Sequence, residues 1–186
     1  MSFKNTRDNI IFGLQREESN KSIIENVFNL SLTHSKYRFQ HFDFYDNVKY
    51  VVIEHKSFNM RYHIDNWTLL KTNKICNSNS LFIFEFKNLL SSKSLNQNQG
   101  ENENYELFYI QFTSKMFKTF EKEYIKYANK IHFEEFFIIP NHTLTRFNPD
   151  DKIILKLKPK NNDYINELID EDNKKYELYK NLLTKG

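Results

Sequence analysis

The spacing of apolar and polar residues predicts a helix followed by a hairpin in the first third of the chain. Apolar residues recur with a helical period over residues 14–32, which predicts one amphipathic helix with a break near Ser19-Asn20. Two runs rich in β-branched and aromatic residues follow, 37–44 and 48–56. They lie on either side of an Asp46-Asn47 turn signal, so we expect them to pair as antiparallel strands.

The remainder of the chain continues this alternation. Further strands are expected at four runs rich in apolar residues: 81–86, 105–112, 135–139 and 152–158. Pro140 should end the third of them. Helical periods predict helices over about 113–129 and from Asp163 onward, whereas residues 64–75 fit a helix or an irregular connection equally well. This order of elements is typical of α/β or α+β proteins, and we expect an α/β fold.

The chain length and one polar segment define the expected domain organisation. With 186 residues, the chain fits a single domain over residues 1–186. Residues 88–104 are poor in apolar side chains and rich in Ser, Asn, Gln and Glu, so we expect a disordered insertion there. Residues 148–186 should form a C-terminal extension that adds one strand and one helix to the core.

The amino-acid composition limits the cellular compartment and the classes of binding partner that we expect. The 27 basic and 24 acidic residues give a net charge of +3, which allows phosphate binding without requiring it. The single cysteine, Cys76, excludes an internal disulfide, and the histidines have no zinc-ligand spacing. The start of the chain does not resemble a signal peptide, and no apolar stretch approaches membrane length. We therefore expect an intracellular protein that is neither secreted nor bound to a membrane.

The strand predicted at residues 48–56 ends in the candidate chemistry, Glu54-His55-Lys56. Residues two apart in a strand share a face, so Glu54 and Lys56 should point the same way and His55 the opposite way. A Glu-x-Lys tripeptide is common by chance, and the chain has a second one at Glu85-Phe86-Lys87. We prefer the first because its predicted hairpin partner carries another carboxylate, Asp43.

The length of the hairpin loop decides whether Asp43 can reach Glu54. A tight turn centred on Asp46-Asn47 would place Asp43 opposite Tyr50, about 13 Å along the strand from Glu54. A longer loop through Val48 and Lys49 would place Asp43 directly across from Glu54, with about 5 Å between their Cβ atoms. A shared cation therefore requires the longer loop.

With that register, the residue types suit a hard divalent cation such as Mg²⁺ or Mn²⁺. Asp43, Glu54 and the backbone carbonyl of His55 would be its protein ligands, beside water and phosphate. Lys56 would orient or deprotonate a water molecule, or neutralise charge at phosphorus. A further acid is expected from the first helix: Glu17, which faces the same side as the apolar stripe, or Glu18 as the second choice.

Six short motifs together resemble the PD-(D/E)xK nuclease superfamily, in particular small members of viral type. They are Gly13 with Glu17 or Glu18, Phe42-Asp43-Phe44, Glu54-His55-Lys56, Asn73-Lys74, Leu81-Phe82-Ile83-Phe84, and residues 136–140. The resemblance covers residues 13–147. The chain departs from the pattern because no proline precedes Asp43, Ser57-Phe58 replaces a common pair ending in arginine, and residues 88–104 are inserted.

This resemblance implies a restriction-endonuclease-like core, a mixed central sheet flanked by helices. It also implies metal-dependent hydrolysis of nucleic acid, DNA above all, by an endonuclease or an exonuclease. Asn73, Lys74 and Arg61 would then contact the substrate phosphates.

Alternatives stay open beside the nuclease. Glu54 and Lys56 can form an ordinary surface ion pair at a strand end, and Asp43 can merely flank a turn. The chain can be a catalytically inactive nuclease fold that binds nucleic acid or protein, or a structural component without a site. The site can instead lie at Glu85 and Lys87 with Asp65. The last helix can have a solvated polar face or form a homodimer through Ile165, Leu168 and Leu183.

Overall fold

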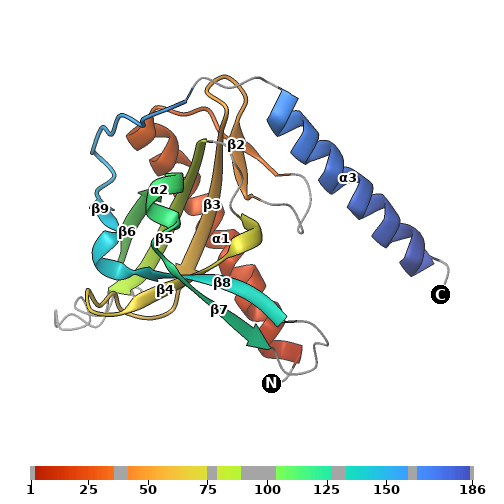
Figure 1. Cartoon of the computed structure of the whole chain (residues 1–186), viewed down its shortest axis with the longest axis horizontal. Coiled ribbons are helices and arrows are strands. Elements are labelled where there is room, and N and C mark those ends of the chain that lie inside the picture. The colour runs from red at the N-terminus through yellow and green to blue at the C-terminus, as the bar shows by residue number, and fades with distance from the viewer. Residues whose placement is uncertain are drawn as a thin grey trace, which may run out of the picture.

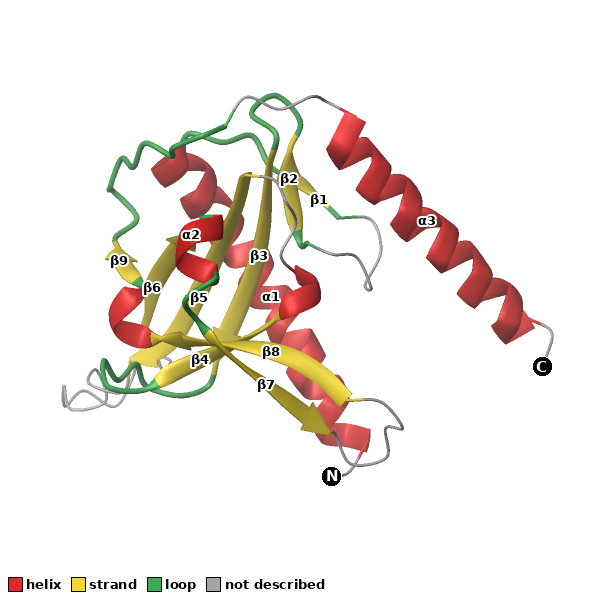
Figure 2. Ribbon diagram, in the orientation of Figure 1, coloured by secondary structure: helices red, strands yellow, loops and turns green. Residues whose placement is uncertain are grey.

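The computed structural model describes residues 3–35, 42–74, 79–88, 104–126, 133–158 and 163–184. Within these ranges the protein has three α-helices and two β-sheets, whose arrangement can be followed in Figures 1 and 2. The elements are, in chain order, α1 (Phe3–Phe28), β1 (Thr33–His34), β2 (Phe44–Asp46), β3 (Val51–Phe58), β4 (Trp67–Lys71), η1 (Thr72–Lys74), β5 (Asn79–Asn88), β6 (Asn104–Gln111), α2 (Ser114–Phe117), β7 (Glu121–Lys126), β8 (Phe133–Pro140), η3 (Asn141–Thr143), β9 (Thr145–Phe147) and α3 (Asp163–Thr184).

The fold is α/β with a mixed central sheet. Its strand order is β1-β2-β3-β5-β6-β9, in which β3 and β5 are parallel and the other neighbours are antiparallel. A second, antiparallel sheet has the order β4-β8-β7. Helix α1 lies behind the central sheet in Figure 1, whereas β4 and β8 cross its other face. Helix α1 covers one face, whereas the second sheet and the short helix α2 cover the other, so the expected sheet flanked by helices is found only in part.

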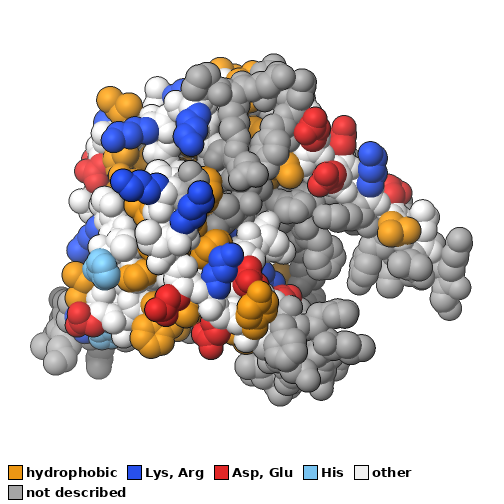
Figure 3. All heavy atoms as spheres, viewed as in Figure 1, with side chains coloured by type: hydrophobic (Ala, Val, Ile, Leu, Met, Phe, Trp, Pro, Cys, Tyr) orange, Lys and Arg blue, Asp and Glu red, His pale blue; other side chains and the backbone are white. Residues whose placement is uncertain are grey.

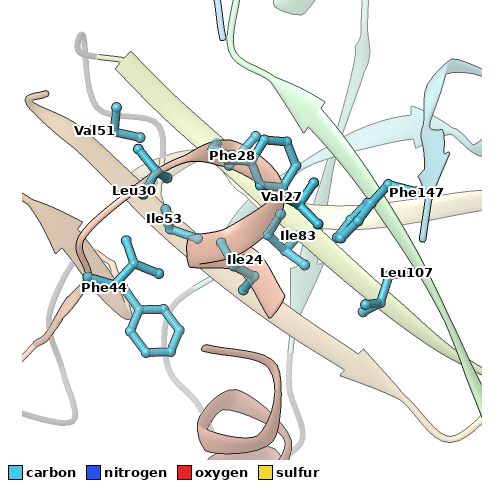
Figure 4. Close-up of a cluster of buried hydrophobic side chains, with 12 residues drawn as sticks. Ile24, Val27, Phe28, Leu30, Phe44, Val51, Ile53, Ile83, Leu107 and Phe147 are labelled. Atoms are coloured by element: carbon cyan, nitrogen blue, oxygen red, sulfur yellow. The ribbon is translucent and has the colours of Figure 1, made fainter. Parts of the chain in front are cut away.

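Burial on both faces explains the nearly continuous apolar runs in β3 and β5. On one face, Ile53 and Ile83 pack against Ile24 and Val27 of α1 (Figure 4). On the other face, Phe82, Phe84 and Phe86 pack against the second sheet and α2. Strand β3, which carries the candidate chemistry, therefore lies between two packed layers.

The central position of Ile53 leads to a stability prediction. Ile53 is fully buried, so Ile53→Val should lower the free energy of unfolding by about 0.5–1.5 kcal/mol. Ile154 is 95% exposed, and Ile154→Val removes the same methylene group from a solvated side chain. Urea denaturation of both variants checks this. Equal effects of the two substitutions would contradict the buried position of Ile53.

Several predicted elements are confirmed. The strands predicted at 81–86, 105–112 and 135–139 correspond to β5, β6 and β8, and Pro140 is the last residue of β8. The final helix begins at Asp163 as expected. The hairpin is formed by β2 and β3, although residues 37–41 of its first strand lie outside the described residues. The insertion predicted at 88–104 also lies outside them, apart from the strand residues Asn88 and Asn104.

Helix α1 differs from the prediction in its length and continuity. It begins at Phe3 rather than near Leu14, and it passes through Ser19 and Asn20 without a break. Asn20 does not end the helix because its side chain is buried and hydrogen-bonded to the sheet, while Ser19 Oγ donates to the carbonyl of Gln15.

The helix predicted over 113–129 is wrong over residues 118–126, and residues 127–129 lie outside the described residues. Its C-terminal part instead forms β7, which pairs with β8 from Glu121↔Ile138 to Lys126↔Phe133. Lys122 lies over the ring of Phe137 across this pair, with 5.1 Å from Nζ to the ring centroid. Pairing along the whole of β8 outweighed the local helical period. The ambiguous segment 64–75 likewise contains β4, also paired with β8, and then η1.

The strand predicted at 152–158 is wrong as well, because this segment is irregular. Side chains replace the backbone ladder: Gln111 exchanges hydrogen bonds with the backbone of Lys156, and Asn79 does so with the backbone of Lys158. The apolar positions Ile153 and Leu155 still pack against the core, which accounts for the alternation in the sequence.

Helix α3 runs outward from the rest of the protein in Figures 1 and 2. Two of the residues expected to make a dimer contact, Ile165 and Leu168, pack instead against Phe42 and Val52 of the same chain. The solvent side of this part of the helix has three exposed acidic residues, Glu167, Asp170 and Glu171. Figure 3 shows acidic side chains gathered on α3. Among the residues that the structure describes, none of the helices has the length and apolar character needed to cross a membrane.

Candidate functional site

The β2–β3 register places Asp43 beside Glu54. Phe44 pairs with Ile53 and Asp46 pairs with Val51, so the connecting loop is the longer one. Continued by one residue, this register puts Asp43 across from Glu54 and not across from Tyr50. The side chain of Asp46 stabilises the loop, because its Oδ1 accepts hydrogen bonds from the N–H groups of Val48 and Lys49, both at 2.8 Å.

Hydrogen bonds to both neighbours of Glu54 hold Asp43 in place. Its backbone N–H donates to the carbonyl of Ile53 at 2.8 Å, and its carboxylate Oδ2 accepts from the N–H of His55 at 2.7 Å. The N–H and C=O of one strand residue point to the same side, so the carbonyl of His55 also faces the Asp43 edge of the strand. Two of the three expected oxygen donors, the Asp43 carboxylate and the His55 carbonyl, therefore lie at one edge of β3, on either side of Glu54.

Glu54 is a buried carboxylate between two ammonium groups. It is 2% exposed, Lys56 Nζ lies 2.8 Å from its Oε1, and Lys74 Nζ lies 3.1 Å from its Oε2. Within the described part of the chain, neither oxygen accepts a hydrogen bond from a backbone group or a neutral side chain. A buried charge needs compensation, which here comes from cations alone.

The electrostatics join Asp43 and Glu17 to the same cluster. Burial, followed by the negative charges of Glu54 and Glu17, raises the pKa of Asp43 to about 8. Burial and then Glu54 raise the pKa of Glu17, and the positive charges of Lys56 and Lys74 oppose this rise. Burial acts to lower the pKa of Lys56, but the surrounding carboxylates, with Glu54 first, raise it overall. The charge of Glu17, on α1, therefore interacts with the charges of the β3 residues Glu54 and Lys56.

The other predicted site residues differ in whether they contact Glu54. Lys74, expected to contact phosphate, instead contacts Glu54. The second-choice acid, Glu18, is exposed and binds His34, with 2.7 Å between its Oε2 and the Nε2 of His34. Arg61 and Asn73 are exposed, and no hydrogen bond or ion pair in the described ranges joins either of them to the carboxylates.

The alternative site at Glu85 lies on the opposite face of the central sheet and is internally saturated. Glu85 is fully buried; its Oε1 accepts from Arg16, and its Oε2 accepts from Asn20 at 2.8 Å and Ser57 at 2.9 Å. Its proposed partner Asp65 is exposed in the loop before β4. Glu85 therefore has no oxygen left to bind a cation, and the geometry favours the Glu54 site.

The number of oxygen ligands and the charge around Glu54 decide whether this site can hold a divalent cation. Across the described ranges, no group of three or more His, Cys, Asp or Glu side chains is close enough to hold a metal ion. Mg²⁺ needs fewer, since it is commonly held by one or two carboxylates with water and phosphate as further ligands. A cation would also relieve the repulsion from Glu54 that adds to burial in raising the pKa values of Asp43 and Glu17.

Sequence reasoning missed the buried polar residues behind this site, Arg16 and Asn20. The available signal was their position, since both continue the apolar stripe of α1 at intervals of four residues before Ile24. A polar residue on such a stripe needs a buried partner, which here is Glu85. No protein-family model, curated protein or solved structure matches this chain.

Proposed function

We propose that this protein is a divalent-metal-dependent nuclease of the PD-(D/E)xK superfamily, with a restriction-endonuclease-like core over residues 13–147. The observation that carries the proposal is the convergence of Asp43, Glu54 and Lys56 at one edge of β3, with Glu17 in the same electrostatic cluster. Ordinary surface ion pairs do not bury a carboxylate between two lysines beside two further acids whose pKa values are raised.

The order of the elements also supports the proposal. Helix α1 is followed by the antiparallel pair β2 and β3, which supplies the acid and the acid-x-lysine. Strand β5 then lies parallel to β3, and β6 is antiparallel to β5. A mixed sheet with a helix on one face is part of the arrangement that the resemblance implies.

Each residue has a chemical role in the proposed reaction. Asp43, Glu54 and the His55 carbonyl would hold Mg²⁺ or Mn²⁺, which supplies positive charge for activating water and for stabilising the anionic transition state. Lys56 is partly exposed and would orient the water or neutralise charge on the phosphoryl oxygens. Lys74 contacts the opposite oxygen of Glu54 and would offer a second cation to a substrate phosphate.

A second candidate is a non-catalytic protein that keeps this scaffold for binding nucleic acid. The observation that favours it is the double ion pair of Glu54, because Lys56 and Lys74 already balance the buried charge without a metal ion. Such a protein would bind nucleic acid through exposed cations and would not cut it.

Cleavage assays on supercoiled DNA, single-stranded DNA and single-stranded RNA decide between the two. A nuclease should cut at least one substrate with Mg²⁺ or Mn²⁺, and EDTA should abolish the cutting because the carboxylates alone cannot activate water. Filter binding under the same conditions reports affinity. Binding without cutting would support the second candidate, and neither binding nor cutting by folded protein would exclude both.

A further inference from the structure

A buried polar network lies on the face of the central sheet opposite to Glu54 and ties α1 to β3 and β5. Its centre is Glu85 of β5, which is fully buried. Oε1 of Glu85 accepts hydrogen bonds from Arg16 of α1, through Nε at 3.0 Å and through Nη2. Oε2 accepts from Asn20 of α1 at 2.8 Å and from Ser57 of β3 at 2.9 Å. One carboxylate therefore joins three elements.

His55 connects this network to the strand that carries the site. Its Nε2 lies 3.1 Å from Nδ2 of Asn20, and its side chain is buried. The amide nitrogen of Asn20 can only donate, so Nε2 of His55 accepts this hydrogen bond. The backbone N–H of the same residue holds Asp43.

The network also fixes the part of α1 that carries Glu17. Among residues 8–19 of α1, none is buried, and Ile11 and Leu14 are 42% and 57% exposed. Among the described side chains of α1, the buried apolar ones begin at Ile24, so the hydrogen bonds of Arg16 and Asn20 help to fasten the preceding turns. Glu17 lies between these two residues in the sequence, and the rotation they impose decides where its carboxylate points.

We propose that Glu85, with Arg16 and Asn20, is a positioning element that sets Glu17 against Glu54 in the metal site. The inference rests on the proposed nuclease function, and Glu85 itself touches no reacting atom. A buried ion pair is an inefficient way to add stability, because desolvation offsets much of its attraction. Its placement directly behind the site strand, and its contact with the turn of α1 that bears Glu17, point to orientation as its role.

A double-mutant cycle of Glu85→Gln and Glu17→Gln tests this inference. The readouts are the affinity for Mn²⁺ by calorimetry, at a temperature where every variant is folded, and the kcat and KM of cleavage. Glu85→Gln should weaken Mn²⁺ binding by about 10-fold or more and lower kcat with little change in KM. In the Glu17→Gln background the same substitution should have no further effect, since the residue it positions is already lost.

Two further variants separate positioning from stability. Ile24→Val loosens the packing of α1 without touching the network, and it should leave the affinity for Mn²⁺ unchanged. Ser57→Ala removes one donor to Glu85 and serves as the milder variant if Glu85→Gln fails to fold. It should weaken Mn²⁺ binding less than Glu85→Gln, again only when Glu17 is present.

The possible results of these experiments distinguish the positioning role of Glu85 from the proposed nuclease function. Additive effects of Glu85→Gln and Glu17→Gln, or an unchanged affinity in Glu85→Gln, would overturn the positioning role while the wild type still binds Mn²⁺ and cuts. A wild-type protein that binds no Mn²⁺ would overturn the proposed function, and the positioning role with it.

Discussion

Replacing Lys56 by alanine should lower the rate of phosphodiester cleavage by about 10²–10⁴-fold while the protein stays folded. The Lys56 ammonium group lies 2.8 Å from Glu54 and its side chain is 41% exposed, so it contacts the buried acid and is also open to substrate. Glu54 keeps one cationic partner in the variant, because Lys74 still contacts its other oxygen. Single-turnover cleavage with saturating Mg²⁺ measures the chemical step, and circular dichroism checks the fold.

Lys71→Ala is a matched control for this substitution. Lys71 forms an ion pair with Glu134 at 2.9 Å, and its side chain is 38% exposed, close to the exposure of Lys56. It lies on β4, outside the carboxylate cluster, so its removal should change the rate less than about twofold. If Lys56→Ala cuts as fast as Lys71→Ala, then Lys56 has no part in the reaction and Lys74 becomes the residue to test.

Substituting Asp43 by asparagine should stabilise the metal-free protein above about pH 5 and remove its response to Mg²⁺. Asp43 has an ordinary pKa of 3.8 when unfolded and a pKa of about 8 in the fold, so the folded state holds a proton that the unfolded state has released. The stabilising contribution of this proton is therefore fully present below about pH 4 and is lost as the pH rises to about 8. An asparagine side chain cannot ionise, so the variant keeps its stability across that window.

Thermal unfolding in EDTA at several pH values measures this difference. The difference in stability between Asp43→Asn and the wild type should grow as the pH rises. Its total should be about 1.4 kcal/mol for each unit by which the pKa of Asp43 in the folded state exceeds that in the unfolded state. Added Mg²⁺ should raise the melting temperature of the wild type, because it binds the ionised site of the folded state, and should affect Asp43→Asn much less.

Asp46→Asn provides the contrast on the same hairpin. Asp46 is also buried, but it accepts three backbone hydrogen bonds, from Ser31 at 2.7 Å and from Val48 and Lys49 at 2.8 Å. Asp46→Asn should lower stability and keep the response to Mg²⁺. A wild type whose stability does not fall between pH 4 and pH 8 would contradict the environment described for Asp43.

The hairpin of β2 and β3 shows how much of the candidate site the sequence pattern can predict. Strand alternation alone indicates that Glu54 and Lys56 share a face and that His55 points away, and the structure confirms both. Whether Asp43 joins them depended on a two-residue difference in loop length. The loop sequence fits either turn, and the side-chain hydrogen bonds of Asp46 to Val48 and Lys49 help to stabilise the longer one.

The wrong predictions of secondary structure lie where pairing with a distant segment overrides the local preference of the sequence. Residues 121–126 have a helical period but form β7 because β8 offers a complete partner. Residues 152–158 alternate like a strand but stay irregular, since the side chains of Gln111 and Asn79 take their hydrogen bonds. Glu85 lies within β5 in the same tripeptide pattern as Glu54 in β3, and only the partners on each face of the sheet distinguish their environments.

The amino-acid sequence by itself determined the α/β class, the strands that form the middle of the central sheet, and the face shared by Glu54 and Lys56. These follow from apolar periodicity and strand geometry, which act over a few residues. Only the tertiary structure decided that Asp43, Glu17 and Lys74 join Glu54, and that Arg16 and Asn20 bind Glu85. Those contacts link residues far apart in the chain, so they depend on register, helix rotation and burial, which no local pattern contains.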